Sequence, residues 1–97
     1  MAEFLLLMHC DSDASSESAW GPYPASLQAA GVLRGGSAIG DGVCVRRAGA
    51  IPPISEHLVG YVKIEALDLH HAGQLVAGNP IYEAGGTVEI RELPETN

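Results

Sequence analysis

The stretch E-F-L-L-L-M-H-C-D-S-D (residues 3–13) decides the fold, because five apolar residues run directly into a histidine, a cysteine and two aspartates. A short apolar run with polar boundaries is typical of a strand buried on both faces. Side chains alternate along a strand, so one face would carry Phe4, Leu6, Met8 and Cys10, and the other Leu5, Leu7 and His9. A small chain can cover one face of a sheet with its own helices, so the second face predicts contact with a second copy.

Length and charge limit the classes of protein that fit. The chain has 97 residues, which predicts a single domain over 1–97 with a modest core that a partner subunit would supplement. The net charge is −7, with five basic against twelve acidic residues, so nucleic acid and anionic membrane surfaces are disfavoured as partners.

The sequence also predicts where the protein works. No apolar run approaches the ~20 residues that span a bilayer, and the apolar run after Glu3 is shorter than the ~7–15 residues of a signal peptide. We therefore expect a cytoplasmic protein. Cys10 and Cys44 are expected to be reduced, buried thiols, and they lack the further ligands that a zinc site requires.

The spacing of apolar, glycine and proline residues predicts the remaining elements. In chain order these are a helix over 25–30 with Pro24 at its first position, a weak strand over 32–39, a strand over 43–47, a strand over 58–64, a helix from 69 to about 77, and a strand over 87–93. Gly31 and Asp68 are the expected C-terminal and N-terminal caps of the two helices. Gly35-Gly36 predicts a bulge or a close backbone approach. This order predicts an α+β, ferredoxin-like antiparallel sheet with two helices on one face.

Six segments, spread in order over nearly the whole chain, carry a family resemblance. They are F-L-L-L-M-H (4–9), L-Q-A-A-G-V-L-R-G-G (27–36), V-C-V-R-R-A-G (43–49), G-Y-V-K-I (60–64), A-G-N-P (77–80) and G-G-T-V-E-I-R-E-L (85–93). In these segments the chain resembles the YCII-related family, in its DGPF-type branch, within the dimeric α/β-barrel superfamily. The resemblance implies a homodimer joined through its sheets and a cleft near the end of the first strand.

Two departures separate the chain from that family. The D-G-P-F signature would fall near residues 51–55, where the sequence reads I-P-P-I-S. The YCII branch also carries a histidine on its first helix, which pairs with an aspartate, and residues 24–27 contain no histidine. The catalytic pair of the family therefore does not transfer to this chain.

His9 is the first candidate for chemistry, because it ends the central strand. Asp11 or Asp13 lies close enough in sequence to orient it, and a histidine with a carboxylate partner can act as general acid or base. A hydrogen-bonded structural histidine at the sheet's edge is the alternative. Cys10 alternates to the opposite face from His9, which disfavours a Cys–His nucleophile pair.

Four further residues are candidates for contacting a small apolar or aromatic ligand, namely Trp20, Tyr23, His57 and Tyr61. Core packing explains Trp20 equally well, and an exposed loop is the simpler expectation for His57. Adjacent helical residues point about 100° apart, so His70 and His71 do not form a metal site. We expect no metal and no cofactor.

These features favour two functions. The first is a cytoplasmic homodimer with a cleft for a small ligand and cofactor-independent lyase- or isomerase-like chemistry at His9. The second is a non-catalytic ligand-binding or regulatory module. DGPF-type relatives often occur beside sigma-factor-type regulators, which makes a protein partner conceivable. A purely structural dimer would be favoured if no pocket is present.

Overall fold

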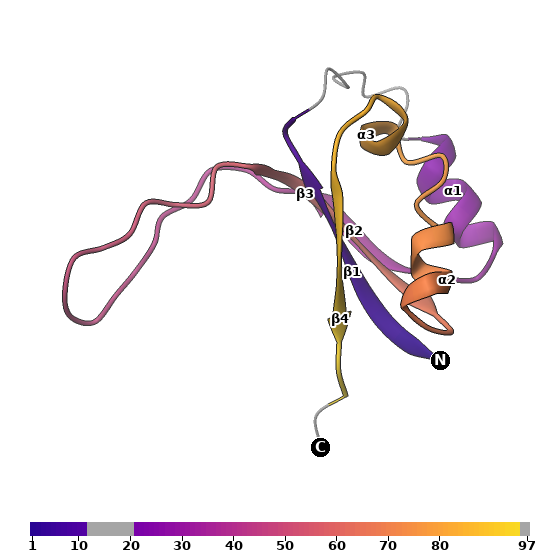
Figure 1. Ribbon diagram of the computed structural model, residues 1–97, viewed down its shortest axis with the longest axis horizontal. Coiled ribbons are helices and arrows are strands. Elements are labelled where there is room, and N and C mark those ends of the chain that lie inside the picture. Colours follow the sequence, from indigo (N-terminus) through magenta and orange to yellow (C-terminus); the bar gives the residue numbers. More distant parts are fainter. Residues whose placement is uncertain (12–20, 96–97) are drawn as a thin grey trace.

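The computed structural model describes residues 1–11 and 21–95. Its elements are β1 (Ala2–His9), α1 (Pro22–Ala29), β2 (Leu33–Ala38), β3 (Leu58–Ala66), α2 (Leu69–Gln74), α3 (Pro80–Glu83) and β4 (Val88–Leu93). The strands form one antiparallel sheet in the order β2-β3-β1-β4. In Figure 1 the helices lie together on one side of this sheet, and a long arm leaves it on the other side. The α+β class is thus confirmed, and the strand order is compatible with a ferredoxin-like arrangement.

Strand β1 has the alternation that its sequence predicts. Phe4, Leu6 and Met8 are at most 2% exposed and face the helices, while Leu5 and Leu7 are half-buried on the opposite face. Leu6 lies opposite Val62 of β3 and Ile90 of β4, at the centre of the sheet. We call the side without helices the outer face. Phe4, Leu6 and Met8 stabilise the fold because their side chains are removed from water, and burial of apolar area is the main favourable contribution to folding.

Helix α1 begins two residues earlier than the sequence predicts. Pro24 was predicted at the first helical position, but both Pro22 and Pro24 lie in the first turn. The N–H groups of a first turn have no acceptor within the helix, so proline loses no hydrogen bond there. Tyr23 and Leu27 are buried on the face toward the sheet. Gly31, with a φ of 76°, ends the helix as expected.

The segment after β3 forms two short helices, α2 and α3, and each begins at its own N-cap residue. Asp68 accepts a hydrogen bond from the backbone N–H of His71 at 2.8 Å, which confirms it as the N-cap of α2. Asn79 caps a further helix, α3, in a segment where the sequence predicted only a connection. Pro80 at the first position of α3 completes the usual start signal.

Strand β2 is interrupted at the glycines, as expected. Its register with β3 shifts between Leu33 and Gly35, where Gly35 has a φ of 153°. A Cβ atom on Gly36 would lie 3.0 Å from the carbonyl oxygen of Tyr61. Glycine therefore permits both the irregularity and the close approach of β2 to β3.

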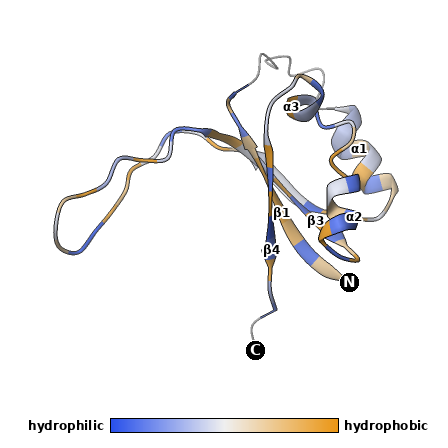
Figure 2. Cartoon of the chain, in the orientation of Figure 1, coloured by the Kyte–Doolittle hydropathy of each residue, from blue (hydrophilic) through white to orange (hydrophobic). Residues whose placement is uncertain are grey.

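Residues 39–57 form the arm, and the strand predicted over 43–47 is wrong. These residues are extended but belong to no sheet. A strand needs a neighbour to pair with, and the apolar alternation alone does not supply one. Hydrophobic residues recur along the arm (Figure 2), and Val43 and Val45 are 83% and 89% exposed. Cys44 between them is half-buried, and Cys10 is exposed, so the prediction of two buried thiols is also wrong.

No helix in the described part of the chain is both long enough and apolar enough to cross a membrane.

Candidate functional site

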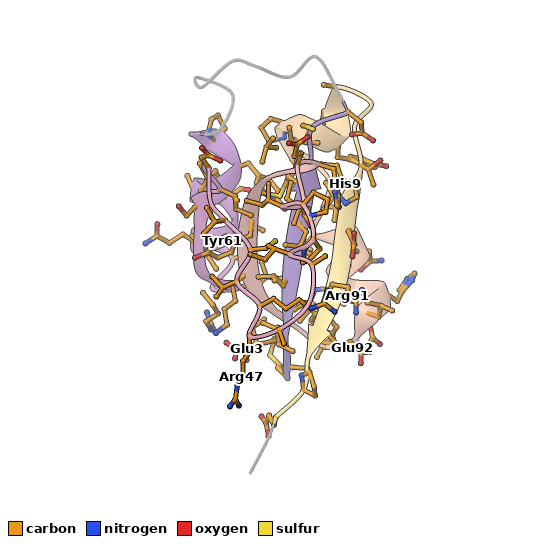
Figure 3. The ribbon with its side chains drawn as sticks, turned by 90° about the vertical axis from the view of Figure 1, so that its left-hand side faces the viewer. Glu3, His9, Arg47, Tyr61, Arg91 and Glu92 are labelled. Atoms are coloured by element: carbon orange, nitrogen blue, oxygen red, sulfur yellow. The ribbon has the colours of Figure 1, made fainter. Side chains whose placement is uncertain are left out.

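His9 lies beside a carboxylate that comes from the other end of the chain. Its Nε2 atom is 3.0 Å from Oε1 of Glu89 on β4. Antiparallel pairing of β1 with β4 places Leu7 opposite Glu89, so His9 is the diagonal neighbour of Glu89 on the outer face. The two side chains are 20% and 36% exposed, which leaves the pair reachable from solvent. Figure 3 shows His9 at one end of this face, with Tyr61 and Arg91 further along it.

The base of the arm runs along the same end of the sheet. The ring of His57 meets the ring of His9 edge-on, with centroids 5.0 Å apart and planes at 71°. The backbone N–H of Cys10 donates to the carbonyl of His57 at 2.8 Å, and the Cys10 thiol lies 3.5 Å from the carbonyl of Glu56. Two histidines and one carboxylate are thus brought together by β1, β4 and the arm.

The hydrogen bond fixes which nitrogen of His9 carries a proton. The pKa of Glu89 is lowered, chiefly by its hydrogen bond with His9, with a smaller contribution from Arg91. Oε2 of Glu89 lies 3.4 Å from a guanidinium nitrogen of Arg91. An ionised carboxylate only accepts hydrogen bonds, so Nε2 of His9 is the donor. In the neutral imidazole Nδ1 then carries the lone pair and is the atom able to take a proton.

Asp11, one of the two aspartates predicted to orient His9, bonds to Thr87 instead, and Asp13, the other, lies outside the described residues. The carboxylate of Asp11 accepts from the backbone N–H of Thr87 at 2.9 Å and from the Thr87 hydroxyl at 2.6 Å. These two bonds lower the pKa of Asp11, to which the charge of His9 makes only a small contribution. Asp11 thereby ties the end of β1 to the start of β4, and it holds in place the two strands that carry His9 and Glu89.

Replacing Thr87 with valine is expected to raise the pKa of Asp11 toward its ordinary value, because valine lacks the hydroxyl whose hydrogen bond is the largest cause of the lowered pKa. A lowered pKa in the folded state stabilises the protein above the unfolded-state pKa of about 3.9 and ceases to do so as the pH falls through the folded value. The Thr87→Val variant should therefore lose less stability than wild type between pH 5 and pH 2 (roughly the range of carboxylate titration). Carboxyl ¹³C titration measures the pKa directly, and Thr87→Ser, which keeps a hydroxyl, should behave like wild type. An unchanged Asp11 titration in Thr87→Val would contradict this role.

The predicted ligand-contacting residues are dispersed. Tyr23 is 3% exposed and donates a hydrogen bond to the carbonyl of Leu75 at 2.7 Å, so it belongs to the core rather than to a ligand surface. Burial raises the pKa of its hydroxyl, with a smaller opposing effect from Asn79. Tyr61 is half-buried on β3, and Trp20 lies outside the described residues. Among the described ones, it is His57 that lies adjacent to His9.

A separate cavity of about 640 Å³ lies between α1, α3 and the strands β2 and β3. Its lining is Met8, Pro24, Leu33, Gly35, Gly36, Ser37, Ala38, Val59, Gly60, Tyr61, Val62 and Ile81. This lining contains no histidine, carboxylate or basic side chain and does not include His9. The cavity suits an apolar ligand, and Tyr61 is the one predicted ligand-contacting residue that borders it.

Metal binding has no support within the described residues. They contain no group of three or more histidine, cysteine or acidic side chains placed to hold an ion. On α2, His71 accepts through Nδ1 from the backbone N–H of Leu67 at 3.0 Å, while His70 lies 3.5 Å from the side-chain amide of Gln74. The two rings serve separate local contacts.

Comparisons with known proteins do not place the chain. No family model matches the sequence. No curated protein matches it significantly either.

Glu89 is the site residue that the sequence interpretation missed. The segment T-V-E-I-R-E-L was recognised as a strand, and the antiparallel sheet was expected. Pairing the last strand against the first places Glu89 and Arg91 on the outer face with His9. The register of the last strand against the first would therefore have identified Glu89. The prediction chose Asp11 instead, because Asp11 is close to His9 in sequence.

Proposed function

We propose that the chain is a small cytoplasmic homodimer related to the YCII family, with cofactor-independent acid–base chemistry at His9 on a small apolar or aromatic compound. The observation that carries this proposal is the hydrogen bond between His9 Nε2 and Glu89 Oε1 at 3.0 Å. The free thiols of Cys10 and Cys44 agree with a reducing compartment.

The chemistry assigned to the pair follows from the roles of its atoms. Glu89 holds the proton on Nε2 of His9 and stabilises the positive charge that forms when Nδ1 accepts a second proton. A base arranged in this way removes a proton from carbon or oxygen of a bound compound and returns it elsewhere on the same compound. Such a transfer is the core step of isomerases and of lyases that require no cofactor.

A homodimer would give the pair an enclosed site. No described helix covers the outer face, on which Leu5, Leu7 and Tyr61 are half-buried around the centre of the sheet. A second copy facing it would remove these apolar groups from water, as expected of a barrel-type dimer. The same approach would restrict solvent around His9, where electrostatic interactions strengthen as water is excluded.

The test is exchange of acidic C–H hydrogens, because it requires only proton removal and return. A panel of small aromatic and aliphatic carbonyl compounds is incubated with the protein in D₂O, and loss of the α-proton signal is followed by ¹H NMR. Wild type is expected to accelerate exchange for some of these compounds, and His9→Gln to lower the rate by about 10²–10⁴-fold, the usual contribution of a general base.

Two further variants make this result specific to the pair. Glu89→Gln keeps the shape but removes the charge, and a smaller loss of rate is expected than for His9→Gln. His70→Gln, in an exposed histidine of α2 whose ring lies 3.5 Å from the side-chain amide of Gln74, should exchange at the wild-type rate. Undiminished exchange in His9→Gln, with circular dichroism showing an intact fold, would refute the catalytic proposal.

The cavity favours a second candidate, a non-catalytic ligand-binding or regulatory module. Its lining is almost entirely apolar and lacks an acid or base, which suits binding without chemistry. In that case an apolar fluorescent probe such as 8-anilinonaphthalene-1-sulfonate should bind wild type and His9→Gln equally, and Ala38→Trp should displace it by filling the cavity.

A further inference from the structure

The arm, residues 39–57, projects from the sheet although its sequence contains several large apolar residues, such as Val43, Val45 and Ile51. The radius of gyration is 14.8 Å, against about 13 Å for a compact domain of 100 residues. Connections of this length without secondary structure are uncommon in compact domains and often have a function. Figure 1 shows that the arm projects from the ends of β2 and β3, away from the helices.

Neither backbone hydrogen bonds nor burial of its valine side chains stabilises the extended shape of the arm within the described residues. Between residues 40 and 56, no backbone group hydrogen-bonds to a backbone group of any residue that the structure describes. The side-chain bonds within it are local: the guanidinium of Arg46 donates to the carbonyl of Ala50, and the backbone N–H of Gly42 donates to the carboxylate of Asp41. Val43, Val45 and Ile51 are 83%, 89% and 62% exposed. Open backbone groups together with exposed β-branched side chains are typical of a segment that pairs with another chain.

The charges identify a second copy as the fitting partner. The arm contains two of the five basic residues, Arg46 and Arg47, and two of the twelve acidic ones, Asp41 and Glu56. The whole net charge of −7 therefore lies outside the arm. The arm has no net charge and presents two adjacent arginines. It is therefore electrostatically compatible with the acidic remainder of a second copy of the chain.

The direction of the arm agrees with this partner. In Figures 1 and 3 the arm extends on the side of the outer face, on which the half-buried Leu5, Leu7 and Tyr61 have no helix over them. A second copy approaching the outer face would therefore come within reach of the arm. Two such copies related by a twofold axis would each receive the arm of the other.

We propose that residues 39–57 clasp a second copy of the chain, burying Val43, Val45 and Ile51 against the partner's body and pairing the backbone of residues 43–47 with it. This inference deepens the proposed homodimer and rests on it. The clasp reaches the site directly, because the arm ends at His57, which meets the ring of His9. Seating the arm on a partner thereby fixes one of the two histidines of the site.

Hydrogen–deuterium exchange of the full chain tests the clasp, because the amides of residues 40–56 donate to no backbone carbonyl in the described part of their own chain. At a concentration where sedimentation equilibrium shows a dimer, amides in 43–47 are expected to exchange at least tenfold more slowly than in the same protein diluted to monomer. A dimer with an unprotected arm would overturn the clasp while leaving the dimer itself intact.

Matched variants separate the arm from the sheet. The pair Val43→Ser with Val45→Ser should weaken the dimer at least tenfold without changing the melting temperature of the monomer, because neither side chain packs in the core. Leu67→Ser, at a residue 70% exposed between β3 and α2, is the control and should leave the dimer unchanged. Leu7→Arg on the outer face should give a monomer in which 43–47 is unprotected. An unchanged dissociation constant in the arm variant would refute the clasp, and a wild type that stays monomeric at all accessible concentrations would refute the homodimer and the clasp with it.

Discussion

Replacing Leu6 with alanine is expected to lower the free energy of unfolding by about 2–5 kcal/mol, the usual loss for a fully buried leucine. Leu6 is 0% exposed and lies between Val62 and Ile90 on the neighbouring central strands. Its removal takes apolar area out of the core and leaves a cavity that strands on both sides prevent from closing. Chemical denaturation followed by circular dichroism measures the loss.

The adjacent residue supplies the control for this prediction. Leu5 has the same side chain in the same strand but is half-buried on the outer face. Leu5→Ala should destabilise the monomer clearly less than Leu6→Ala, since a half-buried side chain has less area to lose. Equal losses in the two variants at monomer concentrations would show that the two faces of β1 are not distinguished as the sheet requires.

Asn79→Ala is expected to destabilise the protein by about 2–4 kcal/mol, the second large effect. Asn79 is 0% exposed, and its Oδ1 accepts from the backbone N–H groups of Ile81 at 2.9 Å and Tyr82 at 3.3 Å. Loss of an N-cap removes about 1 kcal/mol, and a buried donor left without an acceptor adds about 1–3 kcal/mol. Thermal and denaturant unfolding both report this change.

Asp68 provides the comparison, because it is the same kind of cap in an exposed position. Water replaces the lost acceptor at the start of α2, so Asp68→Ala should have a clearly smaller effect than Asn79→Ala. If the two substitutions destabilised equally, burial would not be what makes Asn79 important, and the assignment of a buried cap would fail.

The central strands β1 and β3 were predictable from sequence, because the pattern that marks a buried strand is local. Alternation in β1 reports burial directly, so the two faces of this strand were predicted correctly. The cap residues Asp68 and Gly31 were predictable because their effect on the backbone is local. In contrast, α3 was missed because a four-residue helix leaves no periodic signal, and its cap, Asn79, was read as part of a stop.

The candidate site was only partly predictable, since it depends on contacts between distant segments. His9 was found because a polar residue ends an apolar strand. Its partner, Glu89, lies 80 residues away and becomes apparent only when the register of β4 is known. The strand prediction for residues 43–47 was wrong for a related reason: an alternating segment becomes a strand only where a neighbouring strand is present.

The exposed arm also bears on how the protein avoids aggregation. An extended segment with open N–H and C=O groups and a V-C-V core is a template for uncontrolled cross-β assembly. Two features of the sequence oppose this outcome. Arg46 and Arg47 place adjacent like charges directly after the valines, and Pro52-Pro53 removes two donors from the returning leg. The segment thus accepts a limited number of strand contacts and resists the unlimited stacking that forms a fibril.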